Sequence, residues 1–189
     1  MRAYERFLNY VKIHTTSDEN SNTTPSTRRQ FDLAEILAEE MKKLGKEAFS
    51  KVLSFEIIPA DKYVANFLKI KENSNIHRIT RLRLVDSVPL IFEKTYLPVE
   101  KFNCLHKDEL SNSSLCNILK TRFSIKFSKG EETFYPITPD EEIIKHLNLM
   151  KFQPVIKIER VTFEDENPVM FTERIVRGDK FKYTIVTSF

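Results

Sequence analysis

Apolar residues recur at helical spacing in the first fifty positions of the chain. Residues 4–13 and 26–44 place apolar side chains three or four positions apart, which predicts two amphipathic helices. The stretch 15–25 between them is rich in Ser, Thr and Asn, so we expect a loop there. Gly45 is suited to ending the second helix. Two helices of this size bury little surface by themselves, so they need a partner surface.

After Lys51 the pattern changes to β-branched and aromatic runs separated by turn residues. We expect strands at 52–58, 75–85, 89–97, 123–135, 155–163, 169–176 and 181–187. Helices are expected after Pro59, over 114–122 and over 139–147, and turns at 86–88, 129–130, 167–168 and 178–179. Hairpins interrupted by helices favour an α+β fold built on an antiparallel sheet with flanking helices. We divide the chain into a helical segment, 1–45, and a larger domain, 46–189.

The composition supports a packed core and excludes several classes of protein. Of 189 residues, 41% are hydrophobic and fifteen are Phe, so wholesale disorder is not expected. The formal net charge of +3 is too small to indicate a nucleic-acid binder. The sequence contains neither an apolar run of membrane-spanning length nor a glycine-rich phosphate-binding motif. We therefore expect a soluble, cytoplasmic protein with no membrane contact and no cofactor.

The most informative stretch is the expected strand at 75–85. Strand side chains alternate between faces, so Arg81 and Arg83 share a face with Ile79. A three-residue loop over 86–88 sets the register of the hairpin, in which we expect three pairs: Val85 with Pro89, Arg83 with Ile91, and Arg81 with Glu93. Two arginines then meet one carboxylate.

This charge arrangement has two interpretations. In the first, an anionic ligand completes the site, because guanidinium groups bind phosphate or carboxylate bidentately. In the second, Arg81, Arg83 and Glu93 form an ion pair on a wet sheet face that contributes about 0.2–1 kcal/mol. The residues alone favour the second interpretation, because charged strand faces are common.

Other candidate residues indicate no catalytic or metal site. His106 and Asp108 have the spacing seen in some zinc enzymes, but a zinc hydrolase also needs a second histidine and a bridging carboxylate on a rigid frame. The pair lies in a polar, loop-like segment, so we interpret the spacing as chance. Cys104 and Cys116 are interpreted as small apolar fillers. His77 is interpreted as a strand-surface residue.

An ordered series of short motifs resembles the UTRA domain, the effector-sensing part of GntR-type regulators of the HutC subfamily. The resemblance covers about 39–189. Its motifs are Val52-Leu53-Ser54-Phe55-Glu56, Pro59-Ala60, Arg78-Ile79-Thr80-Arg81-Leu82-Arg83, Pro89 to Glu93, Tyr96-Leu97-Pro98, Ser113-Ser114-Leu115 and Arg177-Gly178-Asp179-Lys180-Phe181.

The resemblance implies a chorismate-lyase-like fold, a homodimer and binding of a small anionic metabolite such as a sugar phosphate. Arg81 and Arg83 match the family's paired arginines, Glu93 matches its pocket carboxylate, and Ser114 matches a hydroxyl that contacts the ligand's anionic group. The residues that depart from the pattern of amino-sugar sensors are Cys116, Met170 and Val176.

Residues from Met1 to about Ala38 resemble instead the start of peptidase T, a zinc aminopeptidase. The matching motifs are Arg6-Phe7-Leu8-Asn9-Tyr10-Val11, Thr15-Thr16-Ser17 and Pro25-Ser26-Thr27. That family's metal ligands lie far beyond this segment. We therefore expect a non-enzymatic effector-binding domain whose winged helix-turn-helix is replaced, so that this chain does not bind DNA directly. The alternatives are an inactive peptidase-like fragment and a lyase-like enzyme of the same fold.

Overall fold

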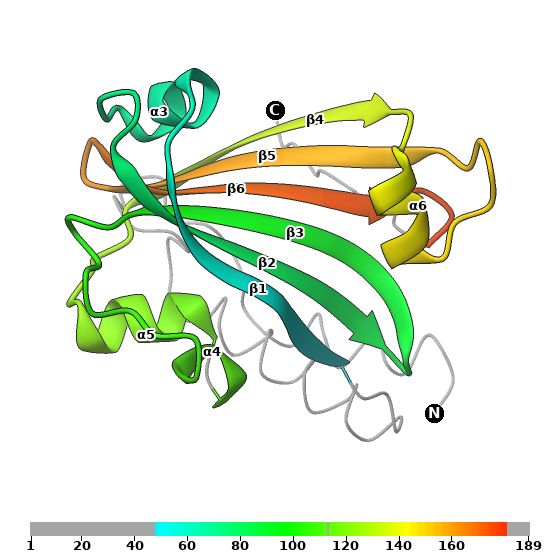
Figure 1. Ribbon diagram of the computed structural model, residues 1–189, viewed down its shortest axis with the longest axis horizontal. Coiled ribbons are helices and arrows are strands. Elements are labelled where there is room, and N and C mark those ends of the chain that lie inside the picture. Colours follow the sequence, from blue (N-terminus) through cyan, green and yellow to red (C-terminus); the bar gives the residue numbers. More distant parts are fainter. Residues whose placement is uncertain (1–47, 113, 181–189) are drawn as a thin grey trace, which may run out of the picture.

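The computed structural model describes residues 48–112 and 114–180 of the chain. Within them, six strands form one antiparallel sheet in the order β1-β2-β3-β6-β5-β4 (Figure 1). The two helices expected within 1–45 and the strand expected at 181–187 lie outside the described residues. The expected α+β fold with an antiparallel sheet and flanking helices is confirmed.

The elements follow the hydrophobic pattern closely. The strands are β1 (Ala48–Pro59), β2 (Asn75–Val85), β3 (Val88–Pro98), β4 (Lys129–Ile137), β5 (Val155–Glu164) and β6 (Asn167–Arg177). The helices are α3 (Lys62–Leu68), α4 (Glu109–Asn112), α5 (Leu115–Arg122) and α6 (Glu141–Leu147). Of these, α4 was not predicted.

Local sequence signals explain where two of the helices begin and end. The Asp61 carboxylate accepts a hydrogen bond from the Val64 N–H at 2.8 Å and caps α3, and Asp140 caps α6 in the same way. Lys69 and Asn148 end these helices in the left-handed conformation. The helix expected after Pro59 therefore starts at Lys62, and Pro59 itself ends β1.

Two local hairpins build the sheet and meet at one seam. The β2–β3 and β5–β6 pairs are sequence neighbours, whereas β3 pairs with β6, which follows it by about 70 positions in the sequence. At this seam Glu93 lies opposite Arg174, and Thr95 lies opposite Thr172.

The β2–β3 turn is shorter than expected. Asp86 and Ser87 form a two-residue turn with positive φ at both positions, as a type I′ hairpin turn requires. Val85 therefore pairs with Val88, so the expected Val85–Pro89 pair is wrong. An irregularity after Arg83 compensates for the lost loop residue, and the expected pairs of Arg81 with Glu93 and of Arg83 with Ile91 are confirmed.

Three further expectations are wrong in detail. Lys129 and Gly130 are the first residues of β4 rather than a turn, and residues 123–128 precede the strand. The β5–β6 turn is at 165–166, because Asn167 already pairs with Glu164 in the sheet. His77 is buried rather than on the surface, and its Nε2 lies 2.9 Å from the Phe102 carbonyl oxygen.

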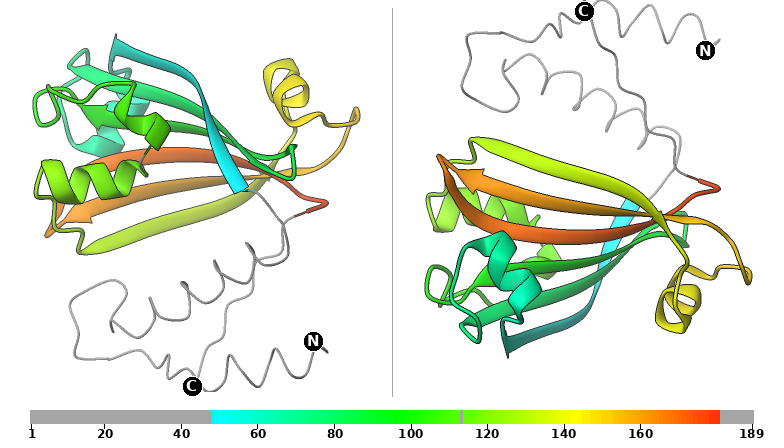
Figure 2. Two further views of the ribbon diagram at one scale, coloured as in Figure 1. Left: turned by 90° about the horizontal axis from the view of Figure 1, so that it is seen from below. Right: turned by 90° about the horizontal axis from the view of Figure 1, so that it is seen from above.

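The helices divide the two faces of the sheet between them. We call the side covered by α5 the α5 face, and the side covered by α3 and α6 the α3/α6 face. Figure 1 shows α3 and α5 at one end of the strands and α6 at the other, and Figure 2 gives two views turned by 90°. The apolar cluster on the α5 face includes Ile79, Leu97, Phe102, Leu115, Leu119 and Met170. The clusters on the other face centre on Phe171 under α3 and Phe92 under α6.

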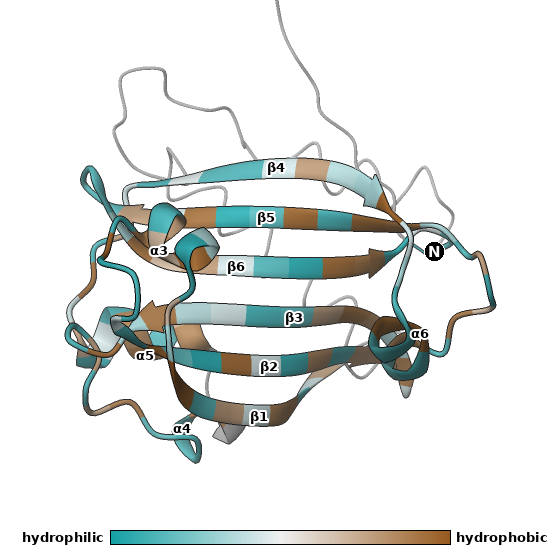
Figure 3. Ribbon diagram, turned by 45° about the horizontal axis from the view of Figure 1, so that its top comes forward, coloured by the Kyte–Doolittle hydropathy of each residue, from teal (hydrophilic) through white to brown (hydrophobic). Residues whose placement is uncertain are grey.

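Polar residues occupy the middle of the sheet. Figure 3 shows hydrophilic positions in the middle of β5 and β6, with apolar stretches on either side. On the α5 face these central positions hold Glu93, Arg174 and Arg160, which belong to neighbouring strands. A buried charge is costly unless it is paired, so this arrangement requires specific partners.

Replacing Leu119 by Ala should destabilise the fold. Its side chain is fully buried in the cluster under α5, so we expect a loss of about 2–5 kcal/mol in the free energy of unfolding. Urea denaturation of the purified chain measures this value. Asn117→Ala, at an exposed position of the same helix, is the control, and an equal loss in both variants would contradict the assignment of the core.

Candidate functional site

Three arginines surround one buried carboxylate on the α5 face. The Glu93 side chain is 0% exposed, and it accepts a hydrogen bond from Nη2 of Arg81. Nη2 of Arg83 lies 3.3 Å from both carboxylate oxygens, and Nε of Arg174 lies 2.8 Å from Oε2. We call these four residues the arginine cluster. Three strands, β2, β3 and β6, each contribute to it.

The arginines differ in how far they are withdrawn from water. The Arg81 side chain is 9% exposed, that of Arg174 is 26% exposed and that of Arg83 is 41% exposed. The Arg81 side chain is therefore nearly enclosed beside Glu93, whereas those of Arg83 and Arg174 are partly exposed. Glu93 is buried, so the arrangement is not the ion pair on a wet sheet face that the residues alone favoured.

The ionised form of Glu93 is strongly favoured. Burial is the largest single influence and by itself raises the pKa of this carboxyl. The charges of Arg81, Arg83 and Arg174, together with the hydrogen bond from Arg174, outweigh burial and lower the pKa from 4.5 to about 2. Glu93 is thus an anion at neutral pH despite its position in the sheet.

The third arginine was not found from the sequence. Arg174 occupies the strand expected at 169–176, but nothing in the sequence shows that this strand lies beside β3. Its contact with Glu93 spans 81 positions. Strand order across the seam is the missing information, because Arg174 lies directly opposite Glu93 once β3 and β6 pair.

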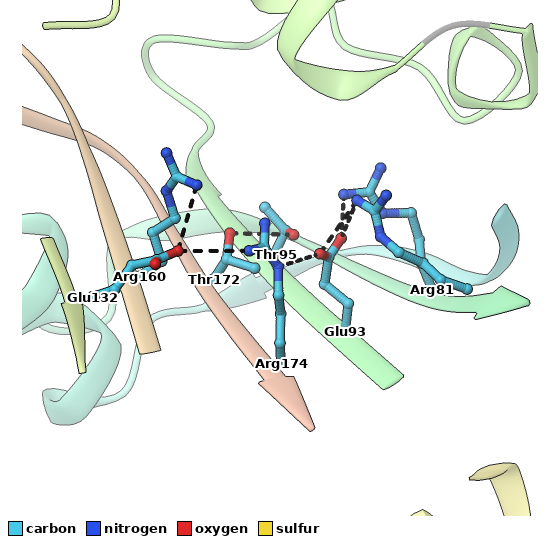
Figure 4. A network of polar contacts seen from close by, with 8 residues as sticks. Arg81, Glu93, Thr95, Glu132, Arg160, Thr172 and Arg174 are labelled. Carbon is cyan, nitrogen blue, oxygen red and sulfur yellow. Dashed lines mark hydrogen bonds and ion pairs between the residues drawn. The ribbon is translucent and has the colours of Figure 1, made fainter. Parts of the chain in front are cut away.

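A second carboxylate lies at the far side of Arg174. The Glu132 Oε1 lies 3.8 Å from Nη1 of Arg174 and 3.4 Å from Nη1 of Arg160 (Figure 4). Two buried threonines, Thr95 on β3 and Thr172 on β6, lie on the strands between Glu93 and Glu132. Their hydroxyl oxygens are 3.5 Å apart. The row of polar groups therefore runs continuously from β2 to β4.

An open pocket lies over this part of the α5 face. It has a volume of about 330 Å³, and its lining residues are Arg83, Ile91, Glu132, Phe134, Ile158, Arg174 and Val176. Arg83 on β2 and Glu132 on β4 lie on opposite sides of the pocket, and Arg174 on β6 lies between them, with its Nη1 3.8 Å from Glu132. Apolar side chains line the rest.

Buried donors without a partner are concentrated in this region. Among the described residues, the Nε atoms of Arg81, Arg83 and Arg160 are buried and have no hydrogen-bond acceptor. The polar network on the α3/α6 face differs. There Lys157 lies 3.0 Å from Glu159 and 2.6 Å from Glu173, and both carboxylates also accept hydrogen bonds from tyrosine hydroxyls. The network on the α3/α6 face is thus saturated, whereas the arginine cluster has more donors than acceptors.

The other residues singled out in the sequence lie elsewhere. Ser114 caps α5, and its Oγ accepts a hydrogen bond from the Asn117 N–H at 3.2 Å. Its expected role as a ligand hydroxyl stays a prediction. Cys104 and Cys116 are exposed free thiols rather than core fillers. Within residues 48–112 and 114–180, no group of His, Cys, Asp or Glu could hold a metal ion.

Several solved structures share this fold. The structure of PhnF from Mycobacterium smegmatis superposes with a TM-score of 0.72 at 22% identity, over 79% of this chain and 67% of that one. A GntR-family regulator from Bacillus cereus superposes with a TM-score of 0.68 at 22% identity, over 75% of this chain and 99% of that one. The fold is that of the ligand-binding domains of GntR regulators.

The UTRA domain matches residues 43–182, so the chain belongs to the UTRA domain family, the effector-binding domains of GntR-family regulators. MngR of Escherichia coli, a mannosyl-D-glycerate transport/metabolism system repressor, is 24% identical over 84% of this chain and 67% of its own length. The repressor NagR of Bacillus subtilis is 26% identical over 77% of this chain and 60% of its own length. The chain thus spans about three fifths to two thirds of these relatives.

The resemblance to peptidase T is also seen in a comparison with known proteins. Peptidase T of Clostridium perfringens is 39% identical over 113 residues, which make up 59% of this chain but only 26% of the peptidase. Such a partial match does not define the chain as a peptidase, and the regulator relatives support a non-enzymatic role. None of the described helices is long and apolar enough to span a membrane.

Replacing Glu93 by Gln should destabilise the domain at pH 7. The substitution leaves three guanidinium groups around a neutral amide, and removing one partner from a buried ion pair costs about 3–5 kcal/mol. Chemical denaturation measures the change. In the control, Glu56→Gln, the lost partner is the exposed Arg78, so a much smaller change is expected, and equal changes would contradict the burial argument.

Acid should remove the stabilisation that ionised Glu93 provides. Because the folded-state pKa of about 2 is below the ordinary 4.5, the contribution is complete above pH 4.5 and is lost as the pH falls through 2. This carboxyl accounts for about 3 kcal/mol over that window. The difference in unfolding free energy between the wild type and Glu93→Gln, measured from pH 6 to pH 2, should therefore shrink on acidification. A constant difference would contradict the low pKa.

Proposed function

We propose that this domain senses a small anionic effector, which binds at the exposed side of the arginine cluster. The observation that carries the proposal is the surplus of cationic donors around Glu93. One carboxylate cannot satisfy three guanidinium groups, and Arg83 and Arg174 line the open pocket. An anion placed between them would accept charge-assisted hydrogen bonds, which are stronger than neutral ones.

The charges around the pocket favour a doubly charged ligand. Four arginines (Arg81, Arg83, Arg160 and Arg174) surround two carboxylates (Glu93 and Glu132), which leaves a local excess of two positive charges. A phosphate monoester carries nearly this charge at neutral pH and matches the geometry of the guanidinium group. A sugar phosphate is therefore our leading candidate, as the family resemblance implied.

Ser114 is not among the residues that line the pocket, so the ligand contact that the family resemblance implies for it stays a prediction. Its Oγ accepts a hydrogen bond from α5, so its O–H remains a donor that could turn to a ligand oxygen. The side chain is exposed at the start of an eight-residue helix, where the backbone dipole favours negative charge.

The signalling mechanism we infer is a population shift. A ligand can shift a conformational equilibrium only by the difference in its affinity for the two states. An anion at the pocket competes with Glu93 for Arg83 and Arg174, so it favours the state in which these side chains face the ligand. In a complete regulator, two copies of the domain would transmit this change to the DNA-binding parts.

Arg83→Met should weaken binding of glucose 6-phosphate about 10- to 100-fold. The substitution removes a charge-assisted contact but keeps an unbranched side chain of similar length. Isothermal titration of the full chain measures the affinity, with glucose as the uncharged control ligand. The matched control variant is Arg78→Met, in which the lost arginine lies on the opposite face of β2 and pairs with Glu56.

Two results would overturn this proposal. The first is undetectable binding of glucose 6-phosphate and of inorganic phosphate by the folded wild type. The second is an equal effect of the two arginine substitutions, because it would place the anion away from the pocket. A melting temperature that rises with phosphate concentration in the wild type is the supporting result.

A further inference from the structure

The pocket contains one polar group that the anion itself does not use. Glu132 extends from β4 on the α5 face, across the pocket from Arg83. Its ion pairs are long, at 3.4 Å to Arg160 and 3.8 Å to Arg174, and its side chain is 26% exposed. A carboxylate has about four acceptor positions, so Glu132 keeps acceptor capacity for a ligand.

Arg160 fixes the place of Glu132. The two residues are cross-strand partners on β5 and β4. The Arg160 guanidinium lies against the backbone of Gly130, where an added Cβ would be 3.0 Å from its Nη2 and 3.1 Å from its Nε. The absence of a side chain at Gly130 therefore lets the guanidinium approach β4 closely and donate from Nη1 to Glu132 at 3.4 Å. Figure 4 shows Glu132 pointing toward Arg174.

We propose that Glu132 is a specificity-determining residue that accepts a hydrogen bond from a hydroxyl group of the effector, on the side of the pocket away from Arg83. Arg160 is the positioning residue for Glu132. This inference rests on the proposed function, since it assumes that the anion lies between Arg83 and Arg174. It adds that the site prefers anions that also carry a hydroxyl group placed to donate to Glu132.

The charge balance favours a neutral donor over an ammonium group. A doubly charged anion already cancels the local excess of two positive charges around the pocket. An added ammonium group would restore an excess, whereas a hydroxyl leaves the balance unchanged. Between Arg83 on β2 and Glu132 on β4, the pocket is also lined by Ile91, Ile158 and Val176, whose apolar side chains suit the carbon skeleton of the ligand.

The test compares two probes that share a phosphate ester: glucose 6-phosphate, which carries hydroxyls, and n-hexyl phosphate, which carries none. The quantity measured is the dissociation constant of hexyl phosphate divided by that of glucose 6-phosphate, which we call the selectivity ratio. In the wild type, glucose 6-phosphate should bind more tightly. In Glu132→Gln its affinity should fall about tenfold relative to that of hexyl phosphate, because an amide oxygen is a weaker acceptor than a carboxylate.

This design separates hydrogen bonding from the general electrostatic effect. Removing a negative charge alone should strengthen binding of both phosphates equally and leave the ratio unchanged. Arg160→Met changes the local charge in the opposite direction, yet it should also reduce the ratio, because Glu132 loses its support. Glu131→Gln is the matched control, since Glu131 precedes Glu132 in β4, faces the opposite side of the sheet and should leave the ratio as in the wild type.

The outcomes distinguish this inference from the proposed function. If neither phosphate binds the folded wild type, both are overturned. If both probes bind, Arg83→Met weakens both, and Glu132→Gln leaves their ratio unchanged, then the anion site stands and the role of Glu132 is wrong. A ratio that falls in Glu132→Gln and in Arg160→Met, but keeps its wild-type value in Glu131→Gln, supports the inference.

Discussion

The shared carboxylate of Glu93 is the interaction on which the polar centre of this sheet depends. Without it, Arg81 would be an unpaired charge with a nearly buried side chain, and Arg83 and Arg174 would repel each other across β3. With it, three strands are joined by charge-assisted hydrogen bonds in a region where apolar packing is interrupted. The cluster therefore joins the three strands and at the same time leaves more guanidinium donors than carboxylate acceptors beside the pocket.

The two faces of the sheet differ in how their partly buried charged groups are paired. On the α3/α6 face, Lys157 is enclosed by Glu159 and Glu173, and tyrosine hydroxyls occupy further acceptor positions. Its pKa is raised above the ordinary value, since the hydrogen bonds and charges of these carboxylates outweigh the opposing effect of burial. That network is closed, and we assign it a structural role. The α5 face keeps unused donors beside a pocket, which is the combination expected of a binding site.

Much of this arrangement follows from short-range sequence information. The spacing of Arg81, Arg83 and Glu93 around a tight turn is enough to bring them together, because a hairpin fixes its own register. The turn is one residue shorter than expected, but the irregularity after Arg83 keeps Arg83 opposite Ile91 and Arg81 opposite Glu93. Arg174 and Glu132 were beyond such reasoning, because their place depends on which hairpins lie side by side. The burial of His77 was missed for a similar reason: its cover comes from Phe102 in a distant loop.

The seam between β3 and β6 has a mechanical consequence. The two hairpins are each continuous in sequence, and strand pairing between them occurs only here within the described sheet. Glu93 and Arg174 form a cross-strand pair at this junction, so a molecule that competes for Arg174 acts on the joint between the two halves of the domain. Arg174 thus belongs both to the lining of the pocket and to the junction between the two halves of the sheet.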